Sequence, residues 1–424
     1  MRSSLGILVV AACGGSPSPL DDGGTLSDGD VPVDGTVAAG TVLYPSDRTL
    51  SPLTADLVAN LRAVHATSAG SDAVFAKIGD SHTVSTSYLA CFAGTNVDLD
   101  SRDLASTVAH FKAGDAAGTT PYQRVSLAAT VGWSAGAVLT GSPTRLQQEV
   151  DAVDPAFATV MFGSNDIGGN RIDLYGQNMA TIVDTLLAQG IIPIMSTIPP
   201  RDDSATADRM VPRYNAVVRA IAQTRGIPLV DLHRELVPLP AHGLASDGIH
   251  LQTGGGGACN LDAAGLMFGN NVRNLHVLAT LDRLRRTVVE SEPAPDAEAP
   301  RLRGTGAPAD PFVIDVLPFG DRRDTATFGT REIASYPACS PADESGNEVY
   351  YRIEVTAATT LRAYVIDHAA DIDLQVLRDA PTATGCISRH DTAVDVAVEP
   401  GTYYVVADTY QDNAGPYTLV VTTD

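Results

Sequence analysis

Two serines of this chain stand in surroundings that suit a nucleophile. One is Ser134, in the stretch GWSAG at 132–136, and the other is Ser81, in the stretch GDS at 79–81. A serine hydroxyl attacks well only beside a base, which a carboxylate commonly orients, and it needs donors for the oxyanion that forms. The nucleophile should therefore be the serine for which the rest of the chain supplies these partners.

The stretch at 132–136 has the G-x-S-x-G spacing of the nucleophile elbow in α/β-hydrolases. In that fold the serine follows the central strand of the sheet, and an acid and a histidine come later on separate loops. Only two predicted strands precede Ser134, and nothing marks a later acid and histidine for this duty. We therefore favour Ser81 and keep Ser134 as the alternative.

Ser81 has a matching acid and base far downstream. In ASDGIHLQ, Asp247 stands three residues before His250. A carboxylate and an imidazole at this spacing can share a hydrogen bond, which fixes the ring tautomer so that the other ring nitrogen can face a serine. We expect Ser81 to be the nucleophile, His250 its base and Asp247 the residue that orients the base.

The oxyanion donors are expected on neighbouring loops. Asn165, in the stretch GSND at 163–166, offers a neutral side-chain amide, and the backbone N–H groups of Ser81 and Gly132 add two donors. Gly136 is the alternative to Gly132, because the segment around them is the least diagnostic one.

From about residue 52 to 287, buried strands alternate with amphipathic helices that end at glycine. This repetition is typical of βα units on a parallel sheet with helices on both faces, and ligands bind at the carboxyl ends of such strands. All the candidate groups come just after predicted strands, so they should meet at one edge. The strands are expected at 73–79, 123–132, 157–163, 191–197 and 227–232.

Taken together, four segments resemble the sequence blocks of the SGNH (GDSL-type) hydrolases. They are GDS at 79–81, Gly132, GSND at 163–166 and DGIH at 247–250. The resemblance covers roughly residues 70–287 and implies a flavodoxin-like sheet and esterase, lipase or carbohydrate deacetylase activity. It assigns the roles given above to the same residues. One departure is His82, where the family commonly has leucine.

Beyond residue 310 the pattern changes to short β-rich runs, which predict a small β-sandwich. PGTYY at 400–404 and GPYTL at 415–419 make this region similar to the bacterial pre-peptidase C-terminal domain. The predicted strands lie in the runs 348–357, 361–368, 372–379, 394–401, 402–410 and 417–423.

The N-terminus reads as an export signal. A short basic region, an apolar run and VAAC at 10–13 resemble a lipoprotein signal in which Cys13 is lipidated; ordinary secretion is the alternative. The predicted organisation is a signal peptide at 1–13, a flexible tether at 14–50, a hydrolase domain at 51–287, a linker at 288–310 and a β-sandwich at 311–424.

Four further cysteines suit an oxidising compartment and allow three pairings. We favour Cys91–Cys259 and Cys339–Cys386, because each pair then stays within one predicted domain. No Cys/His cluster has the spacing of a zinc site, so we expect no metal.

The formal charge of −22 argues against a nucleic-acid partner. The sequence thus predicts an exported enzyme, anchored to a membrane if Cys13 is lipidated. We expect it to cleave carboxylic esters of a small molecule or a polysaccharide through an acyl-serine, without a cofactor. Short acyl groups, including sugar O-acetyl groups, are preferred. The alternative is a non-catalytic carbohydrate- or surface-binding lipoprotein with a degenerate hydrolase domain.

Overall fold

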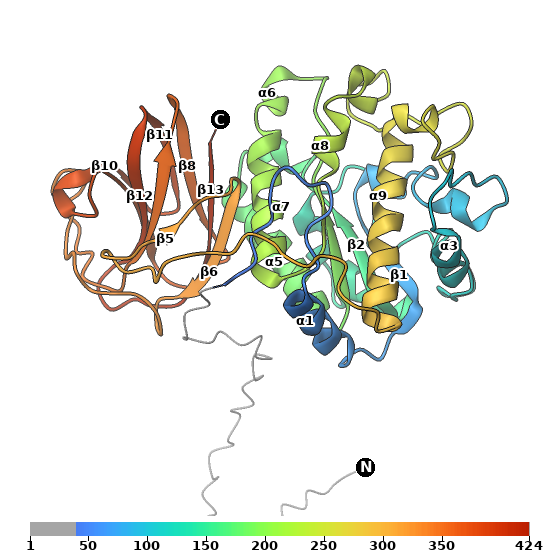
Figure 1. The fold of residues 1–424 in the computed structure, drawn as a ribbon, viewed down its shortest axis with the longest axis horizontal. Coiled ribbons are helices and arrows are strands. Elements are labelled where there is room, and N and C mark those ends of the chain that lie inside the picture. The colour runs from blue at the N-terminus through green and yellow to red at the C-terminus, as the bar shows by residue number, and fades with distance from the viewer. Residues whose placement is uncertain (1–39, 424) are drawn as a thin grey trace, which may run out of the picture. The chain divides into compact units, whose positions relative to one another are not determined.

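The computed structural model describes residues 40–423 (Figure 1). Helices and strands alternate up to residue 289, and strands dominate beyond it. The α-helices are α1 (Ala55–His65), α2 (Ser81–Val84), α3 (Ala105–Lys112), α4 (Arg145–Val153), α5 (Ile172–Leu187), α6 (Ala205–Asp208), α7 (Val211–Arg225), α8 (Leu232–Leu236) and α9 (Gly269–Leu284). Shorter helical segments are η1 (Ala90–Ala93), η2 (Ala135–Leu139), η3 (Asp166–Gly169), η4 (Pro240–Gly243), η5 (Gly265–Met267) and the π-helical η6 (Arg285–Val289).

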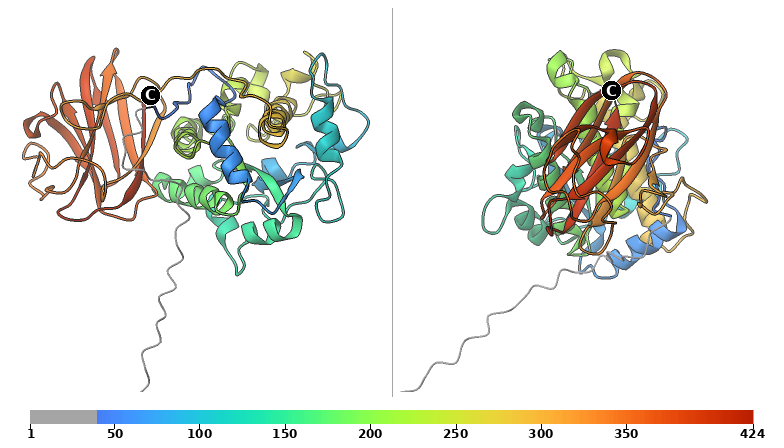
Figure 2. Two further views of the ribbon diagram at one scale, coloured as in Figure 1. Left: turned by 60° about the horizontal axis from the view of Figure 1, so that its bottom comes forward. Right: turned by 90° about the vertical axis from the view of Figure 1, so that its left-hand side faces the viewer.

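One parallel sheet organises the first part, in the spatial order β1-β2-β3-β4. Every residue of β2 and β3 is buried, which explains why these strands read as continuous apolar runs rather than as an alternation. Figure 2 shows helices on both sides of the sheet, so the predicted α/β architecture is confirmed. The strands are β1 (Ser71–Gly79), β2 (Pro155–Met161), β3 (Ile192–Ser196) and β4 (Leu229–Val230).

The prediction of a strand over 123–132 is wrong. Only Ala129 pairs with β1, through an isolated parallel bridge to Gly79, and the rest of the segment is turn and loop. Val125 and Val131 are 81% and 67% exposed, so the apolar residues here have no layer to bury them. The bridge lies on the side of β1 away from β2. It occupies the place of the second strand in the order 2-1-3-4-5, which is the flavodoxin-like order.

The second part is a β-sandwich of two sheets, with the orders β10-β9-β12-β7-β5 and β11-β8-β13-β6. Alternate residues of both sheets, such as Leu374, Val405 and Leu419, meet in its own apolar core. All six predicted runs form strands, and β5, β6 and β10 are additional. The strands are β5 (Phe312–Val313), β6 (Phe319–Asp324), β7 (Val349–Val355), β8 (Thr359–Ile366), β9 (Ile372–Arg378), β10 (Cys386–His390), β11 (Ala393–Val398), β12 (Gly401–Thr409) and β13 (Pro416–Thr423), with a short η7 (Ala383–Gly385).

Both favoured disulfides are present. Cys91 is bonded to Cys259 and Cys339 to Cys386, with Cα–Cα distances of 5.7 and 5.9 Å. Cys13, the signal peptide and most of the predicted tether lie outside the described residues. Within the part that is described, no helix is long and apolar enough to cross a membrane.

Residues 42–44, near the end of the predicted tether, are buried. The Tyr44 hydroxyl donates a hydrogen bond of 2.9 Å to the backbone oxygen of Ile227, and the Tyr44 N–H donates to the Gln223 side chain at 2.7 Å. The division of the chain into five segments stays a prediction.

Candidate active site

Ser81 stands where β1 turns into α2. The side chain of Asp80 caps this helix by accepting a hydrogen bond from the His82 N–H at 3.0 Å. Gly79 is required at the turn, because a Cβ there would lie 2.2 Å from Thr83 Oγ1 and 2.6 Å from the Met161 oxygen. The strand and its cap thus fix the serine at the carboxyl edge of the sheet.

The structure brings the three predicted catalytic side chains together. His250 Nε2 lies 2.9 Å from Ser81 Oγ, and His250 Nδ1 lies 2.7 Å from Asp247 Oδ2. The other oxygen of Asp247 accepts hydrogen bonds from the backbone N–H groups of Ile249 and His250, both at 3.0 Å. The Ile249 N–H and the His250 ring lower the pKa of Asp247 to about 2, so this side chain is ionised at neutral pH.

A cleft of about 460 Å³ is lined by Ser81 and His250 and by the predicted oxyanion donors Gly132 and Asn165, and Asp247 lies beside it. The backbone N–H groups of Ser81 and Gly132 donate to no acceptor among residues 40–423. Gly132 has φ +78°, and a Cβ at this position would meet no atom within 4 Å, whereas one at Gly136 would lie 2.9 Å from Asn178 Nδ2. Gly132 is therefore the glycine that faces the cleft.

The side chains of Asn165 and Asp166 tie the loop after β2 to the segment around Trp133. Asn165 Nδ2 donates to the Trp133 oxygen at 3.0 Å and to Asp80 Oδ2 at 3.4 Å. The Asp166 carboxyl accepts the Ala135 N–H at 3.0 Å, and burial raises the pKa of this carboxyl to about 6. The GWSAG stretch is thereby held against the loop that carries Asn165.

Ser134 stands outside this arrangement. It precedes η2 and does not line the cleft, and its hydroxyl has no hydrogen bond to any of the residues from 40 to 423. The glycine at the start of the GWSAG stretch lies in the cleft, and the serine in its middle does not.

Two arginines that the sequence did not point to brace the site. Arg201 lines the cleft, donates to the Ser164 oxygen at 2.5 Å and pairs with Asp203 at 2.7 Å. The buried Arg273 of α9 donates to the His82 oxygen at 2.7 Å and lies 3.7 Å over the Tyr88 ring. Both hold loops through backbone oxygens, which leave no signal in the sequence.

His82, the departure from the family pattern, is 3% exposed beside His250, with 5.3 Å between the ring centroids. Neither of its ring nitrogens has a hydrogen-bond partner among the described residues, and burial lowers its pKa to about 3. His82 is therefore a neutral group beneath the site. In residues 40–423, no cluster of three or more His, Cys, Asp or Glu side chains is arranged to hold a metal ion.

Residues 78–256, which contain all four sequence blocks, match the model of the GDSL-like Lipase/Acylhydrolase family. The chain carries a GDSL-like lipase/acylhydrolase domain. The sequence prediction of the SGNH (GDSL-type) family is confirmed, and the cleft lined by Ser81 and His250 lies at the carboxyl edge of the parallel sheet.

Solved structures similar to the acylhydrolase domain include a GDSL-like lipase from Bacteroides thetaiotaomicron, with 16% identity over 53% of this chain and 98% of that one and a TM-score of 0.34. Another is a variant of an acetyl xylan esterase from Geobacillus stearothermophilus, with 17% identity over 50% and 95% of the two chains and a TM-score of 0.33. The pre-peptidase C-terminal domain of a Bacillus anthracis collagenase is similar over 18% of this chain and 76% of its own, with 16% identity and a TM-score of 0.16. No curated protein matches the chain.

Proposed function

We propose that this protein is an exported serine hydrolase that cleaves carboxylic esters through an acyl-serine intermediate. The observation that carries the proposal is the chain of contacts from Asp247 through His250 to Ser81, with distances of 2.7 and 2.9 Å, of which His250 and Ser81 line a cleft of the acylhydrolase domain. This is the arrangement that a serine needs for attack on a carbonyl carbon.

The proposed mechanism assigns each step to one of these residues. Ser81 Oγ attacks the ester carbon while His250 Nε2 takes its proton, and the Asp247 carboxylate stabilises the ring as it becomes charged. His250 then gives the proton to the departing alcohol. Water attacks the acyl-enzyme by the same route and releases the acid and the free serine.

The oxyanion is proposed to lie among the Ser81 N–H, the Gly132 N–H and the Asn165 amide. The two backbone groups have no acceptor among residues 40–423, as an oxyanion hole requires before substrate binds. Asn165 donates to Asp80 across 3.4 Å, and this long bond is the one that a substrate oxygen would replace.

Small acyl groups suit the cleft best. The polar side chains of Asn165 and Arg201 line it together with Val131, Ile167 and Ile249, and long acyl chains need a more extended apolar surface than this lining offers. Two disulfides, which are typical of oxidising compartments, support export, and Cys13 would supply the lipid anchor. The proposed mechanism requires no metal or organic cofactor.

The first test is covalent labelling with a fluorophosphonate, followed by peptide mass spectrometry, in the wild type and in the matched variants Ser81→Ala and Ser134→Ala. We expect the label on Ser81. Ser81→Ala should reduce kcat for p-nitrophenyl acetate by at least about 10³-fold, and Ser134→Ala should leave it within about twofold. A label on Ser134, or equal rates for wild type and Ser81→Ala, would reject the proposal.

A further inference from the structure

The β-sandwich is fixed against the acylhydrolase domain by buried contacts. Gln223 of α7 donates to the Gly320 oxygen of β6 at 2.6 Å, and Arg225 of the same helix pairs with Asp367 beyond β8 at 2.5 Å. Gly320 allows the close approach, because a Cβ there would lie 2.5 Å from Ala220. Tyr364, Ile366 and Val420 of the sandwich belong to the core of the acylhydrolase domain.

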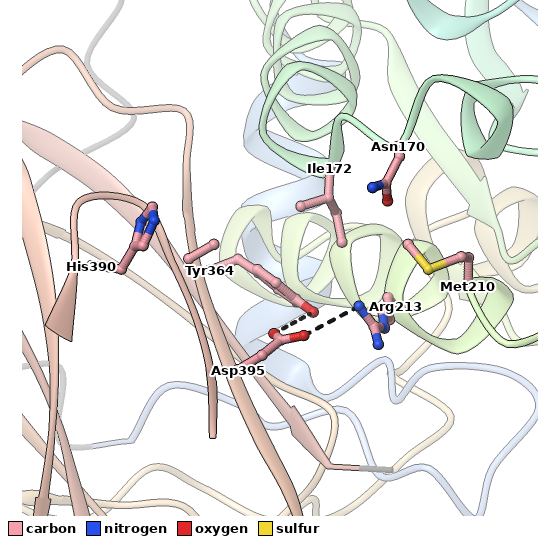
Figure 3. Close-up of a pocket in the computed structure, with 8 residues that line it drawn as sticks. Asn170, Ile172, Met210, Arg213, Tyr364, His390 and Asp395 are labelled. Atoms are coloured by element: carbon pink, nitrogen blue, oxygen red, sulfur yellow. Dashed lines mark hydrogen bonds and ion pairs between the residues drawn. The ribbon is translucent and has the colours of Figure 1, made fainter. Parts of the chain in front are cut away.

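A pocket of about 340 Å³ lies at this junction (Figure 3). Asn170, Ile172, Met210 and Arg213 line it from the acylhydrolase domain, and Tyr364, His390, Ala393 and Asp395 line it from the sandwich. Figure 3 shows Asp395 joined to both the Tyr364 hydroxyl and the Arg213 guanidinium, at 3.4 and 3.3 Å. The pocket is therefore built by both domains.

The pocket and the catalytic cleft are neighbours along the chain. Gly168 and Ala207 line the cleft, and Asn170 and Met210 line the pocket. The Asn170 N–H donates to the Ile167 oxygen at 3.1 Å and the Met210 N–H to the Ala207 oxygen at 2.9 Å, so one helical turn on each side separates the two cavities.

The segment Gly168–Gly169, which we call the ridge, lies between residues that line the two cavities and carries no side chains. Gly168 and Gly169 are exposed, and a Cβ at either position would meet no atom within 4 Å. Since consecutive Cα atoms are about 3.8 Å apart, Gly168 and Asn170 lie within about 7.6 Å of each other. A chain-like molecule can cross this ridge without meeting a side chain of either glycine.

Several hydrogen-bonding groups of the pocket lack partners. Among the described residues, the Asn170 amide and the His390 ring have none, and the buried Nε of Arg213 also has none. The exposed Asn170 amide and His390 ring can bind hydroxyl oxygens, while Met210 and Ile172, which are partly exposed, offer apolar surface for the faces of a sugar ring.

The charges of the pocket select an uncharged ligand. Asp395 is paired with Arg213 and with Arg362, so its charge is already balanced and does not attract a cation. The formal charge of −22 on the whole chain opposes the binding of a polyanion.

We infer that this junction pocket is a subsite for an uncharged oligosaccharide, which crosses the Gly168–Gly169 ridge and presents an O-acyl group to Ser81. The inference rests on the proposed function and adds the substrate class to it. The sandwich then contributes directly to substrate recognition.

The test compares a small ester with esters of increasing length, namely p-nitrophenyl acetate and O-acetylated cello-oligosaccharides from monomer to hexamer. The variants are Gly169→Trp, which raises the ridge, and His390→Ala, which removes a pocket group. Gly255→Trp is the matched control, because Gly255 also has no atom within 4 Å of a Cβ and lines neither cavity. Circular dichroism checks that each variant is folded.

We expect kcat/KM of the wild type to rise with oligosaccharide length. Gly169→Trp and His390→Ala should each lower kcat/KM for the hexamer about tenfold and leave that for p-nitrophenyl acetate within about twofold. Gly255→Trp should change neither. A flat length dependence, an equal loss on both substrates, or a preference for O-acetylated polygalacturonate would overturn the inference.

A second readout separates this inference from the proposed function. Binding of unmodified cellohexaose to the Ser81→Ala variant is measured by calorimetry, with and without His390→Ala. If the wild type fails to cleave p-nitrophenyl acetate, the esterase proposal falls, and binding that depends on His390 still supports the subsite. If cleavage occurs and cellohexaose does not bind, only the subsite is rejected.

Discussion

The pKa of Asp247, beside the cleft, and the pKa values of a group of buried carboxyls in the sandwich are shifted in opposite directions. Asp247 is half-exposed and accepts two backbone N–H groups, and its pKa is lowered to about 2. Glu348 and Asp408 are fully buried, and burial raises their pKa values to about 7 and about 9. The Ile249 N–H and the His250 ring favour the ionised form of Asp247, whereas burial favours the protonated forms of Glu348 and Asp408.

The sandwich group also includes Glu344 and Asp373, each 1% exposed, which share the single guanidinium of Arg389 at 3.0 and 2.6 Å. One oxygen each of Glu344, Glu348 and Asp373 has no hydrogen-bond partner within residues 40–423. A carboxylate that orients a histidine base must stay charged, whereas the raised pKa values of Glu348, Asp373 and Asp408 favour the protonated forms of these three carboxyls. Burial therefore disfavours the charged forms of these sandwich carboxyls, whereas the half-exposed Asp247 keeps the charge that its proposed role requires.

The largest effect should come from replacing Asp247 by asparagine. Two backbone N–H groups bind Asp247 Oδ1, so the only oxygen of an asparagine would stay there and its NH₂ group would face His250 Nδ1. The ring would then carry its proton on Nε2 and could not accept the serine proton. We expect kcat for p-nitrophenyl acetate to fall about 10²–10⁴-fold. Asp373→Asn, the matched change in the sandwich, should leave kcat within about twofold, and a loss in this control would break the comparison.

The two disulfides are expected to differ in how much each adds to the free energy of unfolding. The Cys91–Cys259 bond closes a loop with a sequence separation of 168 and the Cys339–Cys386 bond one of 47. The chain-entropy model gives stabilisations of about 5 and about 4 kcal/mol for loops of these lengths. Each stabilisation is measured by urea unfolding of a variant in which both cysteines of that disulfide are replaced by alanine.

Only the first of these disulfides connects the segments that carry Ser81 and His250. Hydrogen exchange should therefore report earlier opening of β1 in the Cys91/Cys259 variant, with loss of activity at lower urea. In the Cys339/Cys386 variant the early opening should be confined to β9 and β10. Equal opening of both domains in both variants would contradict this local effect.

The parts of the site that the sequence could predict are those set by short-range geometry. Asp247 and His250 lie on one turn, and Ser81 follows a strand that reads as an apolar run. Residue type and spacing were therefore enough to select these three residues. The strand predicted over 123–132 was wrong because its apolar residues follow the pattern of a strand without being buried. Val125 and Val131 are exposed, and the segment pairs with the sheet only through the bridge between Ala129 and Gly79.

Long-range polar contacts left no such pattern. Arg201 and Arg273 act on backbone oxygens of loops that are distant in sequence, and any residue type supplies a backbone oxygen. Asp373 and Asp408 read as the polar positions of half-exposed strands. Their burial depends on how the irregular segment 331–347 folds over the sheet, and no periodicity in that segment predicts its course.

A smaller effect is expected on the free energy of unfolding when the pH is changed. Because the folded-state pKa values of Glu348, Asp373 and Asp408 are raised above those of the unfolded chain, the folded state binds more protons between about pH 4 and these values. The stability they contribute is present at low pH and is lost as the pH rises through about 7 to about 9. Thermal unfolding from pH 5 to 9, with hydrogen exchange of β9, measures this loss.

Asp373→Asn should flatten that dependence, because an asparagine keeps an acceptor for Arg389 and donates to the free oxygen of Glu344. At pH 8 we expect the variant to gain about 1–2 kcal/mol of unfolding free energy. A variant that is less stable than the wild type at pH 8 would show that the ion pair with Arg389 outweighs the burial of charge.

The smallest effect is expected for His82, whose contribution to the free energy of unfolding changes with pH in the opposite direction. Its folded-state pKa of about 3 lies below the usual value of about 6.5, so the unfolded chain binds more protons between these limits and stability falls as the pH falls through that window. Arg273 and His250, which face its ring, add to the cost of protonation. His82→Leu removes two buried nitrogens that lack partners in the described structure, and we expect a gain of about 1 kcal/mol at pH 7 that grows at pH 5.

The same variant also tests whether His82 assists the neighbouring His250. If the 5.3 Å approach of the two rings only fills space, leucine should leave kcat within about threefold and its pH profile unshifted while the melting temperature rises. A shifted profile with unchanged stability would mean that His82 sets the electrostatics of the base. The hydrolase domain would then also use a buried titratable group, and the contrast with the sandwich would no longer hold.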